Sequence, residues 1–273
     1  AYLKPYAEYL PACFSNIDEV LRILDAHPEY RYTLEQTILL EEYRKARPAN
    51  WARLVSHARS GRLAMAPGMW VMPDMNHPTG ESMYMQARLG RVFVEKHFGP
   101  QALTRVAYIA DCWGHHAQLP QILRQCGYEY YFFWRCMRPD VCRNQFVWEG
   151  IDGTRIKAHW LARGYSQLRF PTDSQLINAA ELSFVGATTR QIQDLVQALG
   201  TYANAGDEPV LLFNGGDMAF PQASAPEALK RLNESGQLPP MQFATLDEFA
   251  AAADWERAPV VAGEFNSSLQ GTF

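Results

Sequence analysis

Three aspartates follow segments that are predicted to be parallel strands, and these residues are the best placed in the sequence for acid–base or nucleophilic chemistry. Asp111 directly follows RVAYIA, Asp217 follows PVLLF after Asn-Gly-Gly, and Asp74 follows a segment ending in Val71 and Met72. Loops at the carboxyl ends of parallel strands share one rim, so we expect the three carboxylates to lie together. Two carboxylates in one cleft are the minimum for glycoside hydrolysis, one as nucleophile and the other as acid and then base.

Asp217 could instead be a solvated turn residue without a catalytic role, because aspartate is common in turns. Gly215 and Gly216 precede it and let the backbone bend sharply and approach a ligand. The pairing with Asp111 on one rim favours the catalytic interpretation.

Tandem histidines stand four and five residues after Asp111, at His115 and His116. Imidazole and carboxylate groups are ordinary zinc ligands. The pair is equally consistent with a hydrogen-bonding group at a helix start and an exposed neighbour. We predict a substrate contact for His115 and interpret His77 as a turn residue.

Aromatic side chains are frequent near the expected rim, at Trp70, Trp113, Trp134, Trp148, Trp160 and Tyr165. Sugar rings stack on aromatic faces, although aromatic residues in strands more often belong to the core. Trp113, Trp70 and Tyr165 are the predicted substrate contacts of this type, together with Asp74.

The elements that must position these residues alternate between short apolar runs and longer amphipathic stretches, the pattern of βαβ units. The sequence predicts strands over residues 30–34, 63–72, 105–110, 130–134, 146–148, 155–161 and 209–213. It predicts helices over residues 17–26, 38–47, 51–60, 81–98, 119–126 and 188–199. With no repeat, linker or low-complexity tract, residues 1–273 are predicted to form a single α/β domain.

Composition limits the classes of partner. A net charge of −4 gives no broad positive field for nucleic acid or acidic lipid, and no apolar run is long enough to cross a bilayer. The five cysteines are odd in number and lack metal-binding spacing, which is typical of reduced thiols. We therefore expect a small polar substrate, no nucleic-acid or membrane partner and a cytoplasmic location, while a homo-oligomer stays open.

Several ordered segments resemble one known family. The run IADCWGHHAQLPQIL over residues 109–123 is similar to the nucleophile segment of glycoside hydrolase family 38 α-mannosidases. Blocks that agree in order are QTILLEEY, GRLAMAPGMWVMPD, GESMYMQ, FVWEGIDGTRIKAHWLARGY, LLFNGGD and the closing GEFNSSLQGTF. The resemblance covers nearly the whole chain, and bacterial-type members are the most similar.

The resemblance implies a seven-stranded (β/α) barrel-like domain, incomplete at its first strand, and a retaining mechanism on α-mannosides. It implies that Asp111 is both nucleophile and ligand of one zinc ion and that Asp217 is the acid/base. The family's other ligands are a His-x-Asp pair on the first strand and a late histidine, but no His-x-Asp precedes the first predicted helix and no histidine follows His159. We therefore expect a piece of a longer enzyme, one that binds zinc weakly.

Two rival functions are considered. A metal-dependent carbohydrate deacetylase would use a similar barrel, but it needs two histidines four residues apart on one face, and the sequence has no such pair. A catalytically silent carbohydrate-binding domain would keep the fold without the metal. Zinc analysis with assays of mannoside hydrolysis and acetate release separates the three.

Overall fold

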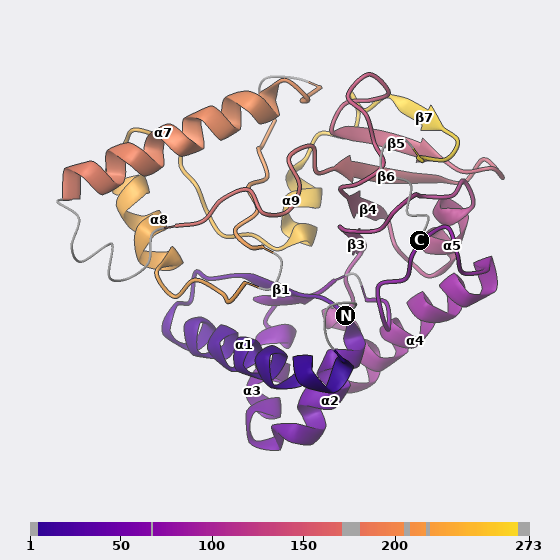
Figure 1. Cartoon of the computed structure of the whole chain (residues 1–273), viewed down its shortest axis with the longest axis horizontal. Coiled ribbons are helices and arrows are strands. Elements are labelled where there is room, and N and C mark those ends of the chain that lie inside the picture. The colour runs from indigo at the N-terminus through magenta and orange to yellow at the C-terminus, as the bar shows by residue number, and fades with distance from the viewer. Residues whose placement is uncertain (1–4, 67, 171–180, 205–207, 217–218, 267–273) are drawn as a thin grey trace.

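Helices and strands alternate through most of the chain, as the sequence predicts (Figure 1). The structure is a computed structural model that describes residues 5–66, 68–170, 181–204, 208–216 and 219–266. The helices are α1 (Tyr6–Ala26), α2 (Thr37–Ala46), α3 (Pro48–Arg59), α4 (Gly80–Phe98), η1 (Pro100–Ala102), α5 (Leu119–Gln125), α7 (Glu181–Gly200), α8 (Ala225–Glu234) and α9 (Leu246–Ala252). The strands are β1 (Tyr32–Leu34), β2 (Leu63–Met65), β3 (Val106–Ile109), β4 (Tyr130–Phe133), β5 (Gln145–Glu149), β6 (Arg155–Trp160) and β7 (Val260–Ala262).

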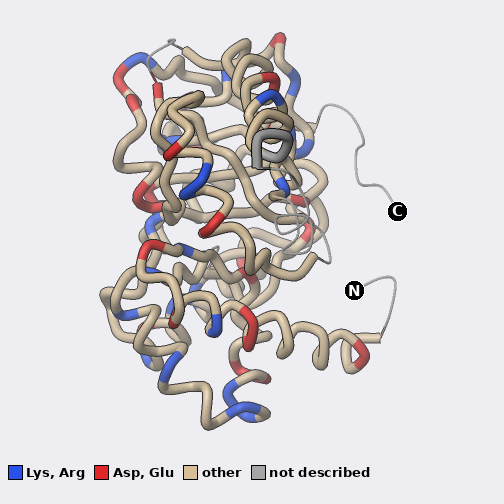
Figure 2. The backbone as a smooth tube through the Cα atoms, turned by 90° about the vertical axis from the view of Figure 1, so that its left-hand side faces the viewer, with Lys and Arg blue, Asp and Glu red and all other residues tan. Residues whose placement is uncertain are grey.

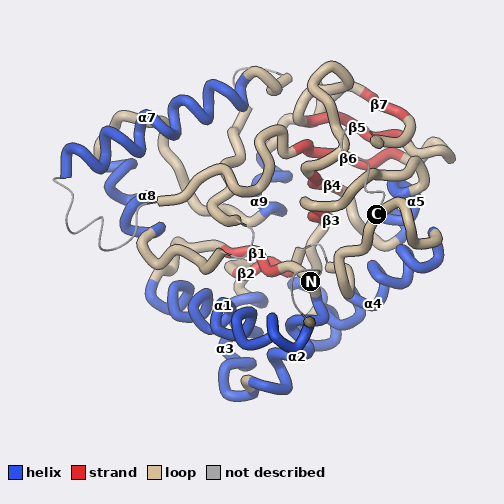
Figure 3. The backbone as a smooth tube through the Cα atoms, viewed as in Figure 1, coloured by secondary structure: helices blue, strands red, loops and turns tan. Residues whose placement is uncertain are grey.

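The strands form two sheets in the described part of the chain (Figure 3). β1 and β2 pair in parallel, with Tyr32 opposite Leu63. The larger sheet has the order β3-β4-β6-β5-β7, in which β3, β4 and β6 are mutually parallel and β5 runs antiparallel to β6. All four residues of β3 and of β4 are buried. Strands that are buried on both faces read as continuous apolar runs, which explains RVAYIA and YYFF.

Helices α1, α2 and α3 lie together beneath the two-stranded sheet in Figure 1. Their apolar faces share one core cluster with that sheet, in which Leu21, Leu24, Tyr43 and Leu54 are fully buried. The exposed faces of these helices carry ion pairs such as that of Arg53 with Asp25. The N-terminal third of the chain is therefore a helical layer that supports β1 and β2.

The architecture is mixed α/β with a parallel-rich sheet, and the predicted seven-stranded barrel is not confirmed. Residues 209–213 are predicted as a strand but form none in the structure, and the next residue, Asn214, makes only an isolated parallel bridge with Leu168. The Phe213 N–H donates to the side-chain oxygen of Gln167 at 3.1 Å instead of to a strand. A ladder therefore does not extend along this segment, and the described strands do not close into a ring.

Other differences from the sequence prediction concern element lengths. α1 starts at Tyr6 rather than residue 17, and β2 ends at Met65 rather than residue 72. α8, α9 and β7 were not predicted. α9 begins with a capping box formed by Thr245 and Glu248, a signal that the sequence does contain.

Helix α4 is held close to the chain segment that follows β2 by a glycine. A Cβ atom on Gly90 would lie 1.9 Å from the Gly68 carbonyl oxygen, a backbone atom that cannot turn away. The Trp70 N–H donates to the Gln86 carbonyl at 2.9 Å across the same contact. The missing side chain of Gly90 thus sets how closely α4 approaches this segment.

Gly90→Ala is expected to lower the free energy of unfolding by about 1–3 kcal/mol, because the methyl group must push the two backbones apart. The matched control is Gly186→Ala in α7, where the nearest atom to a new Cβ is Arg190 Nη1 at 3.9 Å. There the substitution should add roughly 0.5–1 kcal/mol through helix propensity. Urea unfolding measures both, and equal effects of the two substitutions would contradict the packing argument.

Acidic and basic residues are interspersed along the backbone in the view of Figure 2. Among the described residues, no helix combines the length and apolar character needed to cross a bilayer.

Candidate active site

Asp111 lies two residues beyond the carboxyl end of β3, and its side chain is 35% exposed. The Arg135 Nε donates to Asp111 Oδ1 in an ion pair. The Tyr165 hydroxyl donates to Oδ2 at 3.3 Å. The carboxylate is therefore held by one strong and one weak donor while it stays accessible.

Arg135 is fixed in direction by two indole rings. Its guanidinium carbon lies 4.1 Å from the ring centroid of Trp113 and 4.1 Å from that of Trp134. These two cation–π contacts stabilise the charge of the guanidinium and restrict its rotation. Trp113, a predicted sugar platform, is thus committed to the arginine that pairs with Asp111.

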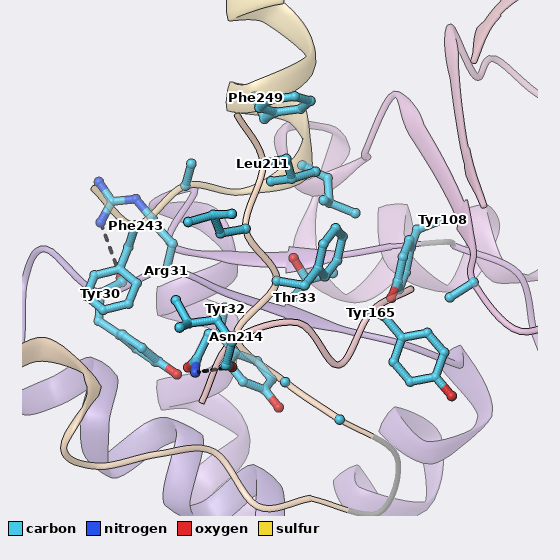
Figure 4. A pocket seen from close by; sticks show the side chains of 18 of the residues that line it. Tyr30, Arg31, Tyr32, Thr33, Tyr108, Tyr165, Leu211, Asn214, Phe243 and Phe249 are labelled. Atoms are coloured by element: carbon cyan, nitrogen blue, oxygen red, sulfur yellow. Dashed lines mark hydrogen bonds between the residues drawn. The ribbon is translucent and has the colours of Figure 1, made fainter. Parts of the chain in front are cut away.

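Two tyrosines, Tyr108 and Tyr165, line the same cavity as Asp111, and Figure 4 shows these two tyrosines next to each other. Tyr165 meets Trp134 edge to face at 5.3 Å, and Tyr108 stacks on Phe213 at 5.6 Å. Burial raises the pKa of the Tyr108 hydroxyl well above its ordinary value, and the Glu35 and Asp111 carboxylates add to the increase. The Tyr108 hydroxyl is therefore neutral, and it also hydrogen-bonds with Glu35.

Asp111 and both tyrosines line a cavity of about 1260 Å³. This volume is above the range of roughly 300–1,000 Å³ that is usual for small-molecule sites. Away from Asp111 the walls are largely apolar and aromatic, with Tyr30, Phe243 and Phe249 among the lining residues (Figure 4). Asp111, Glu35, Tyr108 and Tyr165 are among the polar lining residues of the cavity.

Asp217, the predicted acid/base, lies outside the described residues. Gly215, Gly216 and Ala219, which are described and flank it in sequence, line the same cavity as Asp111. The described residues on both sides of Asp217 therefore border this cavity.

Two other predicted substrate contacts lie outside the cavity lining. Trp70 packs edge to face on Phe93 at 5.8 Å, within the N-terminal core. Asp74 Oδ1 accepts the Asn76 N–H at 2.9 Å and so closes a turn. The Cys112 thiol donates to the Pro73 carbonyl at 2.8 Å, which joins this turn to the loop after Asp111.

His115 is completely buried, with an exposed fraction of 0%. Its Nε2 donates to the Arg135 carbonyl at 3.0 Å, and its Nδ1 accepts the Tyr131 hydroxyl at 2.6 Å. Burial lowers the pKa of His115 to about 4, so the ring is neutral near neutral pH. A substrate contact, as predicted for His115, would require a ring nitrogen to give up its protein partner.

Sequence reasoning missed Arg135, Tyr108 and Glu35. Arg135 stands two residues after β4, and Glu35 directly follows β1. Both residues therefore follow the same carboxyl-end rule as Asp111. Tyr108 gave no such signal, because its position within β3 reads as core.

A metal site is not formed by the described residues. They contain no group of three or more His, Cys, Asp or Glu side chains that could hold a metal ion. Both Asp111 oxygens also have protein donors, from Arg135 and Tyr165. Asp111 by itself does not meet the four-ligand requirement of a structural zinc or the three protein ligands of a catalytic one.

A parallel-rich α/β domain that presents a strand-end carboxylate to a large cavity fits the class of α/β glycoside hydrolases. The sequence matches the glycosyl hydrolases family 38 N-terminal domain over residues 1–265. The chain belongs to this family, as its ordered sequence blocks predict.

Relatives agree with this assignment. The chain is 26% identical over its full length to human alpha-mannosidase 2C1, and it covers 25% of that protein. It is 24% identical to alpha-mannosidase G of Dictyostelium discoideum, in a match that covers 87% of this chain and 20% of that protein. The crystal structure of an alpha-mannosidase from Enterococcus faecalis V583 shares the fold with a TM-score of 0.83 at 24% identity, over 97% of this chain and 29% of that one. The chain thus spans about a quarter of the length of these proteins.

Proposed function

We propose that this domain hydrolyses terminal α-mannosides with retention of anomeric configuration, with Asp111 as nucleophile and Asp217 as acid/base. The observation that carries the proposal is the placement of Asp111: a strand-end carboxylate, oriented by Arg135 and open to the cavity, in a chain of family 38. The names of the relatives supply the substrate class.

The geometry around Asp111 suits a nucleophile. Oδ1 is committed to Arg135, whereas Oδ2 has the longer contact of 3.3 Å with the Tyr165 hydroxyl. Oδ2 is therefore the oxygen that can be released for attack on the anomeric carbon. The charge of Arg135 keeps a countercharge beside the carboxylate as it reacts.

The reaction then follows two displacements. Asp111 Oδ2 forms a bond to the anomeric carbon while the glycosidic carbon–oxygen bond breaks, and Asp217 gives its proton to the departing oxygen. Water next attacks the glycosyl-enzyme, its proton passes to Asp217, and the bond to Asp111 breaks. Two inversions give net retention.

Zinc is part of the proposal only as a family expectation. The described residues do not make up a metal site, so no step above runs through a metal ion. Asp111 would contribute one ligand, and a metal held by one carboxylate binds weakly. Metal analysis of the purified protein with and without added zinc measures this directly.

The test of the proposed function is the first-formed product of an aryl α-mannoside, followed by proton NMR. The expected product is α-mannose, which mutarotates later to the anomeric mixture. β-Mannose as the first product would contradict the double displacement, and release of acetate from an acetylated sugar would favour the deacetylase alternative.

A catalytically silent carbohydrate-binding domain is the second candidate, favoured by the absence of a metal-binding group among the described residues. It predicts saturable binding of mannosides by calorimetry without turnover, including when zinc is supplied. Turnover by the purified chain excludes it.

A further inference from the structure

The backbone that carries Arg135 is held from inside the core by His115. The ring of His115 joins two residues of one neighbouring segment, because Nε2 bonds to the Arg135 carbonyl and Nδ1 to the Tyr131 hydroxyl. A carbonyl can only accept, so Nε2 carries the hydrogen, and in the neutral ring Nδ1 is then the acceptor for the Tyr131 hydroxyl. Both hydrogen bonds therefore depend on a single tautomer.

A second restraint acts on the residue after Arg135. Cys136 has a φ of 66°, in the left-handed region that residues with a side chain rarely occupy. Its Sγ accepts the Gly114 N–H at 3.0 Å, next to His115 in the chain. Such a conformation persists where its surroundings over-determine it, and it often marks functional sites.

A third restraint fixes the loop that carries both Asp111 and His115. His115 and Phe265 exchange backbone hydrogen bonds of 3.0 and 2.9 Å. The Phe265 ring lies in the main core, stacked against Phe133 at 6.0 Å. The His115 backbone is therefore a fixed point from which its side chain can hold Arg135.

These contacts form a continuous chain of residues from the core to Asp111. The Tyr131 hydroxyl bonds to the His115 ring, and the His115 ring bonds to the Arg135 carbonyl. The Arg135 guanidinium contacts Trp113 and Trp134 and pairs with Asp111. We propose that the Tyr131–His115 pair is a positioning device that aims Arg135 at the nucleophile. His115 is thus a positioning residue rather than a substrate contact, an inference that rests on the proposed function for its effect on catalysis.

The variant that tests the device is Tyr131→Phe, which removes one hydroxyl and keeps the ring in the core. The matched control is Tyr128→Phe, because Tyr128 is equally buried and belongs to the same core cluster. Among the hydrogen bonds of the described residues, His115 bonds to Tyr131 and not to Tyr128. We expect Tyr131→Phe to lower kcat on an aryl α-mannoside about tenfold, the scale of one buried hydrogen bond, with KM within about twofold. The control should leave both constants within about twofold.

A double-mutant cycle separates positioning from general destabilisation. The Arg135→Leu protein has no guanidinium for His115 to position. In this background we therefore expect Tyr131→Phe to cause no further loss of kcat. An additive tenfold loss in that background would overturn the proposal, as would an equal loss in Tyr128→Phe.

A readout without substrate keeps this inference distinct from the proposed function. Nitrogen-15 NMR of the free protein should show the Nε2–H tautomer of His115 in the wild type and shifted indole resonances of Trp113 and Trp134 in Tyr131→Phe, with Tyr128→Phe unchanged. If the protein turns over no mannoside but these shifts occur, the proposed function is wrong. The inference that the Tyr131–His115 pair positions Arg135 is then still supported. Indole resonances that do not respond to Tyr131→Phe would overturn the device whatever the activity.

Discussion

Asp111→Asn is expected to reduce kcat on aryl α-mannosides by at least about 10³-fold, because the amide cannot form the glycosyl-enzyme. The replacement has nearly the same shape, and Asp111 is partly exposed, so the loss of its ion pair with Arg135 should change stability little. Steady-state kinetics and urea unfolding of the same preparation measure the two effects.

The matched control for this variant is Asp140→Asn. Asp140 also pairs with an arginine, Arg138, but it lies on the surface with a side chain that is 60% exposed. Its substitution should leave kcat within about twofold. An Asp111→Asn protein that keeps a tenth of the wild-type kcat would remove Asp111 from the nucleophile role.

Covalent labelling gives a direct test of the same assignment. An activated fluorinated mannoside should lose its leaving group and leave the sugar on an oxygen of Asp111, since the fluorine slows the second displacement. Mass spectrometry of the digest would place the label on the peptide that contains residues 109–123. A label on any other carboxylate would contradict the mechanism.

Asp217→Asn is expected to have an effect that depends on the leaving group. General acid–base catalysis contributes typically 10²–10⁴-fold, so mannosides with a poorly acidic alcohol as leaving group should lose about that factor. A strongly acidic phenol leaves without protonation, so its release in the first step should be much less affected. A Brønsted plot of kcat/KM against the leaving-group pKa measures the difference.

Azide provides the complementary check on Asp217. It attacks the glycosyl-enzyme without needing a base, so it should accelerate turnover of the Asp217→Asn protein and yield mannosyl azide with retained configuration. The wild type should respond little. If the losses in Asp217→Asn were equal for all leaving groups and azide had no effect, Asp217 would not be the acid/base.

The sequence by itself determined most of the local elements and the position of Asp111, the proposed nucleophile. Continuous apolar runs predicted the buried strands β3 and β4, and the carboxyl-end rule selected Asp111 without any alignment. Ordered sequence blocks predicted the family, and the family match over residues 1–265 confirms it. These features depend on short segments, whose periodicity and end residues are present in the sequence.

The tertiary structure decided which groups meet. Arg135 reaches Asp111 from the segment after β4, and His115 is buried and bonds to Tyr131. Residues 209–213 have a strand-like sequence. The Phe213 N–H nevertheless donates to the Gln167 side chain, and these residues form no strand in the structure. Hydrogen-bond partners, unlike periodicity, depend on contacts between segments far apart in the chain, and no local pattern specifies them.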